Sequence, residues 1–294
     1  MKQKFTEWKP SLQSLDLVTT ANNILDDYES QGYVLTLRQL YYQLVSRDII
    51  PNNVKEYTKL GNVISRARLA GLIDWSMIED RTRVPETRSH WESPSEIIES
   101  AVSSYYLSRW ENQKNYIEVW CEKDAVSNII KPVCRKWDIL FMANRGYSSQ
   151  SAIYNAHKRL AVKGQNKSVK IIYLGDHDPS GMDMDRDINN RIEIFTYGEI
   201  RRIVKRIALN MEQVEEFHPP ENPAKQKDSR FEQYVVEYGE SSWELDALEP
   251  SVLADIIEKA IMEFVDLDEF DKVAEKEQEH KDNLIELTKD IDWD

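Results

Sequence analysis

The chain has 294 residues, of which 41% are hydrophobic and 10% aromatic, so it can bury a sizeable core and is not a disordered acidic chain. Its formal net charge of −14, taken over the whole chain, argues against a nucleic-acid-binding protein. The sequence contains no apolar run long enough to span a bilayer and no secretory signal at its start, so we expect a cytoplasmic protein without membrane contact. Cys121 and Cys134 lie in apolar-rich segments and are expected to be buried and reduced.

The negative charge is distributed unevenly along the chain. Residues 231–294 contain 5 Lys and Arg against 21 Asp and Glu, a net charge of −16. The preceding 230 residues contain 33 against 31, a net charge of +2. The acidity therefore belongs to the C-terminal fifth, and the charge argument against nucleic-acid binding does not apply to the rest of the chain.

The first part of the chain has the pattern of a small helical domain. Thr36 is a good N-cap for the second of three helices, and Gly71 follows the third. The helices are expected over residues 11–30, 37–47 and 56–69, and a short β-compatible segment over residues 72–83. Because three helices and a β-like segment are the outline of a winged helix, we expect residues 1–90 to form a winged-helix DNA-binding domain.

Beyond this domain, helices and apolar strands alternate, which is typical of a mainly parallel sheet covered by helices. Strands are predicted over residues 116–121, 139–142, 169–174 and 203–209, and helices over residues 95–111, 125–137, 149–160 and 182–194. We therefore expect an α/β fold with an α-rich N-terminal domain. Its further parts are a linker and connecting helix over residues 91–111, an α/β domain over residues 112–249 and an acidic helical extension over residues 250–294.

Three carboxylates follow predicted strands. Asp176 and Asp178 come directly after one strand, and Glu122 ends another. Since the carboxyl ends of parallel strands meet at one edge of a sheet, the three side chains are expected at a common ligand-binding rim. Oxygen ligands of this kind suit Mg²⁺, or Mn²⁺, and indicate phosphoryl chemistry. The structural alternative is that Asp-x-Asp forms a turn and caps a helix. His177, between the aspartates, is expected to point away and not to ligate.

These residues resemble a Toprim domain. The matching motifs are Glu122-Lys-Asp-Ala-Val126, Gly146-Tyr-Ser-Ser149 and Asp176-His-Asp-Pro-Ser-Gly181. They are similar in particular to the Toprim domain of the topoisomerase VI A subunit and its meiotic double-strand-break relative. The resemblance implies that Glu122, Asp176 and Asp178 bind Mg²⁺.

A second, separate motif, Arg38-Gln-Leu-Tyr-Tyr42, resembles the motif in the winged-helix domain of the same family, whose final tyrosine attacks DNA. Helical spacing places Tyr41 on an apolar stripe with its neighbouring leucines, whereas Tyr42 shares a face with Arg38. The resemblance therefore implies that Tyr42 is the nucleophile, and Arg38 is suited to stabilise its phenolate and the phosphate. The structural alternative for Tyr42 is a half-exposed helix aromatic.

Basic residues near the third helix form a candidate DNA surface. Residues 36–83 contain 8 Lys and Arg against 5 Asp and Glu, a net charge of +3. The candidate DNA-binding residues are Lys55, Lys59, Arg66 and Arg68 near the third helix, and Arg81 and Arg83 at the expected wing. The alternative is an ordinary solvated helix face. A second basic run, residues 201–206, alternates like an edge strand and is expected to shield that edge instead of binding DNA. Glu244 and Asp246 are expected to be surface carboxylates, and the alternative is that they support the metal site or lie at an interface.

The resemblance as a whole implies a Mg²⁺-dependent DNA transesterase like the topoisomerase VI A subunit, similar to the small standalone proteins of the Mini-A type. In that family the tyrosine of one protomer meets the metal site of the other, so a homodimer on double-stranded DNA, associated with the nucleoid, is implied. Strand passage would require a separate ATPase B-type subunit. Two alternatives stay open: a Toprim nuclease that uses water as its nucleophile, and a catalytically inactive DNA-binding protein.

Overall fold

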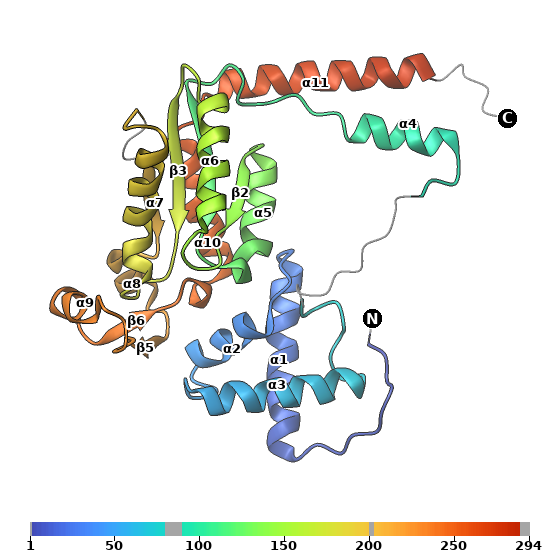
Figure 1. Ribbon diagram of the computed structural model, residues 1–294. Helices are drawn as coiled ribbons and strands as arrows, with labels where there is room; N and C mark the ends of the chain where they lie inside the picture. The colour runs from blue at the N-terminus through green and yellow to red at the C-terminus, as the bar shows by residue number, and fades with distance from the viewer. Residues whose placement is uncertain (1, 80–89, 200–202, 289–294) are drawn as a thin grey trace.

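The computed structural model describes residues 2–79, 90–199 and 203–288. The chain has an α/β architecture, in which a helical N-terminal unit (residues 2–79) precedes an α/β unit (residues 90–199 and 203–288) built on a four-stranded sheet (Figure 1). Within these residues, no helix has both the length and the apolar character needed to cross a membrane.

The N-terminal unit contains the three predicted helices, α1 (Leu12–Ser30), α2 (Leu37–Ser46) and α3 (Val54–Leu69). Each begins at a residue whose side chain caps the helix, because Ser11, Thr36 and Asn53 accept hydrogen bonds from backbone N–H groups of the first turn. On α2 the capping is reciprocal, since the Gln39 side chain accepts a hydrogen bond from the Thr36 N–H at 2.8 Å. The apolar faces of the three helices form one core.

The segment after α3 differs from the predicted wing. In its described part, residues 72–79, Ile78 makes an isolated bridge with Leu35 and no strand is formed. Arg68 holds this segment, because its Nη2 donates to the Trp75 carbonyl at 2.7 Å and its guanidinium lies over the Trp75 ring at 4.5 Å. The segment is therefore fastened to the last turn of α3 and not paired in a ribbon.

The sheet consists of four parallel strands, as the alternating pattern predicts. They are β1 (Asn115–Cys121), β2 (Leu140–Ala143), β3 (Ser168–Leu174) and β4 (Val204–Ala208), in the order β2-β1-β3-β4. β4 lies at an edge, where the basic run over residues 201–206 was expected. Because β1 is followed by β2 on one side and neighbours β3 on the other, the strand order reverses between β1 and β3, which is where α/β sheets bind ligands.

Helices cover both faces of the sheet (Figure 1). One face packs against α5 (Ser127–Lys136) and α10 (Pro250–Met262), and the other against α6 (Gln150–Lys163) and α7 (Gly181–Phe195). The strand period of two separates the faces, since Val119 and Cys121 belong to the first core and Trp120 to the second. Leu253 and Ile257 of α10 are fully buried in the first core, so the acidic extension expected from residue 250 begins only after α10.

Shorter elements complete the α/β unit. They are α4 (Pro94–Ser103), α8 (Met211–Phe217), β5 (Glu221–Pro223), α9 (Phe231–Tyr238), β6 (Ser241–Trp243), α11 (Leu267–Thr288) and single 3₁₀ turns over Asp124–Val126 and Leu245–Ala247. The connecting helix predicted to reach residue 111 ends at Ser103, because the chain extends to bury Trp110, whose indole N–H donates to the Trp137 carbonyl at 2.7 Å. α11 lies beside α4, at the end of the molecule opposite α3 (Figure 1).

Candidate functional site

The predicted carboxylates meet at the carboxyl ends of β1 and β3. Cys121 and Leu174 are partners in the last pair of these strands, so the residues that follow them are neighbours. The Glu122 N–H donates to the Leu174 carbonyl at 2.8 Å, and the Asp176 N–H donates to Glu122 Oε2 at 2.9 Å. Glu122, Asp176 and Asp178 are all buried. We call these ends, with the loop over residues 175–181, the carboxylate rim.

Arg206 of the edge strand β4 stabilises the loop over residues 175–181 by hydrogen bonds to its backbone carbonyls. Its Nη2 donates to the carbonyls of Gly175 and Asp176 at 2.9 and 2.6 Å, and its Nη1 donates to the Gly181 carbonyl at 3.0 Å. Gly181 begins α7 so close to the loop that a Cβ atom there would lie 2.3 Å from the Asp176 carbonyl oxygen. The glycine is therefore a steric requirement of the loop, and Arg206 has a role inside the rim that edge shielding did not predict.

Asp178 caps α7, as the structural alternative for Asp-x-Asp expected. Its Oδ1 accepts hydrogen bonds from the Gly181 N–H at 2.7 Å and from the Ser180 hydroxyl at 2.9 Å, and its Oδ2 contacts Lys225 Nζ at 2.8 Å. Burial opposes ionisation, but these contacts outweigh it and hold the Asp178 pKa below its ordinary value. Asp178 is thus an ionised carboxylate that already has a cation.

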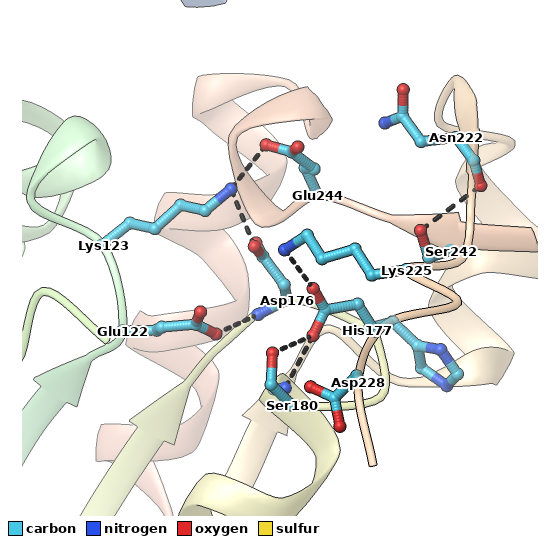
Figure 2. A network of polar contacts seen from close by, with 12 residues as sticks. Glu122, Lys123, Asp176, His177, Ser180, Asn222, Lys225, Asp228, Ser242 and Glu244 are labelled. Carbon is cyan, nitrogen blue, oxygen red and sulfur yellow. Dashed lines mark hydrogen bonds and ion pairs between the residues drawn. The ribbon is translucent and has the colours of Figure 1, made fainter. Parts of the chain in front are cut away.

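His177 lies away from the carboxylates, as expected (Figure 2). It is fully buried, and its Nδ1 lies 2.8 Å from the Tyr234 hydroxyl. Burial and the charge of Arg206 lower its pKa to about 4, so the imidazole is neutral at physiological pH. It supports the loop and does not contact the carboxylates of the rim.

Lys123 lies among the acidic side chains in the place where a cation is expected. Its Nζ contacts Asp176 Oδ2 at 2.8 Å and Glu244 Oε2 at 2.6 Å (Figure 2). It also contacts Asp246 Oδ1 at 3.2 Å. The expectation that Glu244 and Asp246 are surface carboxylates is wrong for Asp246, whose side chain is fully buried. It is buried because the 3₁₀ turn after β6 places it between Leu245 and Ala247 against the rim.

Negative charge exceeds positive charge at the rim. The carboxylates are Glu122, Asp176, Asp178, Glu244 and Asp246, and the cations that contact them are Lys123, Lys225 and Arg38. Burial, together with the charges of Glu122 and Asp246, raises the Asp176 pKa to about 7 even though Lys123 opposes the shift. Burial also raises the pKa of Glu122, to which the charge of Asp178 contributes. The site therefore has a surplus of carboxylate that a proton or a further cation would relieve.

The rim has the chemistry of a divalent-metal site but not its arrangement. Over residues 2–79, 90–199 and 203–288, no three acidic, His or Cys side chains are grouped as a metal ion requires. The oxygens that such an ion would take are engaged by Lys123 at Asp176 and by Lys225 at Asp178. The surplus carboxylates fit Mg²⁺ or Mn²⁺, provided that the two ammonium groups move aside.

The predicted pair on α2 reaches the rim through ion pairs. Arg38 Nη2 lies 3.3 Å from the Tyr42 hydroxyl, as the four-residue spacing predicts, and it also contacts Glu244. Arg38 Nε contacts Asp246 Oδ2 at 3.1 Å. Tyr42 is only 4% exposed and so is not the half-exposed aromatic of the structural alternative. Burial and the Glu244 charge raise its pKa to about 12, against the opposing charge of Arg38.

The predicted DNA-binding residues separate into two groups. Lys55, Lys59 and Arg66 are exposed on one face of α3 and line a groove of about 660 Å³ with Lys9 of the N-terminal segment, which sequence reasoning missed. Arg68 belongs to the contacts with residues 75–78 and not to this groove. Arg81 and Arg83 lie outside the described residues.

Comparison of the chain with protein-family models and with curated proteins finds no match. A function for the chain must therefore be inferred from the motifs and from the geometry of the rim. That geometry adds Lys123, Lys225 and Arg206 to the residues expected from the sequence. For Lys123 there was a signal, since it directly follows Glu122 at a strand end, whereas Lys225 lies in a loop without any periodic pattern.

Proposed function

We propose that the protein is a metal-dependent DNA-cleaving transesterase with the winged-helix and Toprim organisation of the topoisomerase VI A subunit. Tyr42 is the nucleophile, and Glu122, Asp176 and Asp178 are the candidate ligands of Mg²⁺ or Mn²⁺. The proposal includes a homodimer on double-stranded DNA and, for strand passage, a separate ATPase subunit, both of which the family resemblance implies. The contacts that support it join Tyr42 to the rim of its own chain, so it does not include the exchange of tyrosines between protomers.

One observation carries the proposal: side-chain contacts run without interruption from the candidate nucleophile to the carboxylate rim. Arg38 contacts the Tyr42 hydroxyl and Glu244, and Lys123 contacts both Glu244 and Asp176. Two motifs more than 130 residues apart in the sequence thus converge on one polar network. A phenol, a guanidinium and a group of carboxylates are the parts needed for phosphoryl transfer to tyrosine.

The proposed step exchanges one phosphodiester bond for another. The Tyr42 oxygen bonds to a DNA phosphorus, the bond from that phosphorus to the 3′-oxygen breaks, and the phenolic proton is lost while the leaving oxygen gains one. Arg38 is placed to stabilise the charge on the phosphate oxygens. A divalent ion held by the rim carboxylates would supply electrostatic stabilisation of the leaving oxygen.

Before DNA binds, the contacts keep Tyr42 unreactive. Its pKa is raised to about 12 by burial and by Glu244, so the phenolate is scarce near neutral pH. Arg38 is meanwhile bound to Glu244 and Asp246. An arriving phosphate would compete with these carboxylates for Arg38, so DNA binding and activation of Tyr42 are coupled.

We expect Tyr42→Phe to reduce covalent protein–DNA linkage by a factor on the order of 1,000 or more, because it removes the attacking oxygen and keeps the ring. The protein is incubated with end-labelled duplex DNA and Mg²⁺ or Mn²⁺ and quenched with detergent, and the protein linked to 5′ ends is measured. Tyr154→Phe, which alters a tyrosine on α6, serves as the matched control and should retain linkage. Linkage that persists in Tyr42→Phe would contradict the role of Tyr42.

A Toprim nuclease is the second candidate, and the burial of Tyr42 favours it. A phenol with a pKa of about 12 is a poor nucleophile, whereas a metal ion at the rim could activate water without any group from α2. The same experiment separates the candidates, because a nuclease would cut DNA in Tyr42→Phe without forming links. Salt-sensitive DNA binding with neither cutting nor links would instead indicate a DNA-binding protein without catalysis.

The groove on α3 provides a test of DNA binding that is independent of cleavage. The affinity for DNA falls as salt rises, and each phosphate contact adds about 0.9 to the steepness of log affinity against log salt. Replacing Lys55, Lys59 and Arg66 together by alanine should therefore make this dependence less steep by about 2 to 3. Arg68→Ala should leave that slope unchanged and lower the unfolding free energy by about 1.5–3 kcal/mol, because it loses charged hydrogen bonds. Fluorescence anisotropy between 50 and 200 mM salt and chemical unfolding measure the two effects. Equal slopes for the two variants would contradict this division.

A further inference from the structure

A cavity of about 430 Å³ lies beside Tyr42, between the N-terminal unit and β5. Its size is that of a site for a single small organic group, and it lies between two packed units, where such sites are common. Its walls come from α2, from the start of α3 and from β5. Arg38, Tyr42 and Glu244 line this cavity and also belong to the polar network described above. The other lining residues have no role in the proposed chemistry.

One wall of the cavity is aromatic. Tyr41 packs edge-on against Tyr42, with ring centroids 5.4 Å apart, and against Tyr57 of α3, with centroids 5.2 Å apart. The Tyr41 hydroxyl donates to Asn52 Oδ1 at 2.9 Å, which fixes the middle ring. Tyr41 and Tyr42 are each 4% exposed and form the base of this wall, whereas Tyr57 is half-buried and is the ring whose face a planar group could reach.

A second wall presents a polar group with a fixed orientation. Asn52 Nδ2 donates to the Glu221 carbonyl at 2.7 Å and to Asn222 Oδ1 at 3.0 Å, so the oxygen of Asn222 is used and its orientation is set. Asn222 Nδ2 is buried and has no hydrogen-bond partner among the residues that the structure describes. In Figure 2 this amide projects from β5 on the side of Glu244. Asn222 thus offers a donor, and Glu244 an acceptor, next to the aromatic wall.

The mouth of the cavity adjoins positive charge. Val54, which is 81% exposed, lines the cavity and is followed by Lys55, the first basic residue of the α3 groove. Arg38 lines the same cavity next to Tyr42, whose hydroxyl it contacts. A strand whose phosphates follow these cations would pass the opening with its bases directed towards the aromatic wall.

We propose that this cavity binds one nucleobase of a DNA strand, unpaired or turned out of the duplex, next to the phosphate that Tyr42 attacks. The inference rests on the proposed function, which supplies the DNA. Aromatic faces combined with a fixed amide donor are the means by which proteins hold an unstacked base, because every base has a flat face and acceptor atoms on its edge. The cavity would give the cleavage site a dependence on base identity and on the ease of unpairing.

The test measures binding in EDTA, without cleavage, so its outcome does not depend on Tyr42 chemistry. A labelled 15-nucleotide oligothymidylate and the same backbone with abasic tetrahydrofuran residues throughout are titrated by fluorescence anisotropy. We expect the full chain to bind the strand with bases at least about fivefold more tightly, since stacking of a base on an aromatic side chain has that effect or more. Tyr57→Leu and Asn222→Ala should each reduce this ratio towards one, whereas Tyr57→Phe, which keeps the ring, should retain it.

Controls separate the cavity from the rest of the protein. Tyr154→Leu alters a tyrosine elsewhere on the surface and should keep the full ratio. Circular dichroism establishes that each variant is folded, and Asn222→Ala tests the cavity from a different element if Tyr57→Leu is unstable. A ratio of one in the unaltered chain, or an unchanged ratio in both cavity variants, would overturn the proposal. Tight binding of free thymidine monophosphate would assign the cavity to a mononucleotide and also overturn it. If the unaltered chain forms no covalent links with DNA but still prefers the strand with bases, the proposed function is wrong and the cavity proposal stands.

Discussion

Replacing Lys123 by methionine should destabilise the folded chain by about 3–5 kcal/mol at pH 8, which is the cost of removing one partner from a buried ion-pair network. Lys123 contacts Asp176, Glu244 and Asp246, and only 20% of its side chain is exposed. Without the ammonium group these carboxylates repel one another in a buried site. Against the cost of its own burial, the three carboxylates raise the Lys123 pKa, so the group is charged throughout the range tested.

The same substitution should cost less at pH 5, because Asp176, whose pKa is raised to about 7, takes up a proton and no longer needs a cation. Chemical unfolding in EDTA at the two pH values measures the difference. Lys136→Met removes a lysine that pairs with Glu258 on the surface, and this control should change stability by less than about 1 kcal/mol. An equal loss in the two variants at pH 8 would show that the Lys123 contacts are not a buried network.

Asp176→Asn should make the pH dependence of stability flatter between about pH 4 and pH 7. The Asp176 pKa is raised from 3.8 to about 7 in the folded chain, so the folded state binds this proton more tightly than the unfolded state does. Stability is therefore lost as pH rises through that window, and the asparagine variant does not lose it. Between pH 4 and pH 8 the difference in unfolding free energy should move in favour of the variant by on the order of 2–4 kcal/mol.

The expected signal is the change with pH and not the offset, because asparagine also disturbs the hydrogen bond from the Leu245 N–H to Asp176 Oδ1. Unfolding curves in EDTA at unit steps of pH provide the measurement. Asp271→Asn, at an exposed position on α11, is the control and should run parallel to the unaltered chain. A constant offset for Asp176→Asn would contradict the raised pKa. Because the variant loses a candidate metal ligand, we also expect it to form no covalent DNA links under the proposed function.

The sequence predicts well the features that depend on period and on strand direction. The apolar period locates the three N-terminal helices and the four strands of the sheet, and their parallel direction brings Glu122 and Asp176 together. Helical spacing likewise predicts the contact between Arg38 and Tyr42. These are short-range consequences of backbone geometry, which recur in any sequence with the same pattern.

The contacts that join the two units are not predictable in this way. Lys123 meets Glu244 and Asp246, which lie more than 120 residues further along the chain, on a turn after a three-residue strand. Strands as short as β5 and β6 have no detectable period, so nothing in the local sequence indicates that Lys225 reaches Asp178. Asp246 was expected at the surface because a charged residue usually lies there, and tertiary packing overrode that preference.

The positions of α3 and α11 have a consequence for how the molecule meets a polyanion. α3 contains four basic residues and one acidic residue, whereas α11 contains three basic and eight acidic residues, and the two helices lie at opposite ends of the molecule (Figure 1). Such a separation gives the protein a permanent dipole, on which the field of a polyanion exerts a torque. The molecule would turn during its approach so that α3 leads and α11 trails. Under the proposed function, the acidic helix would contribute to the encounter with DNA at long range, by setting the orientation of arrival, without touching the bound strand.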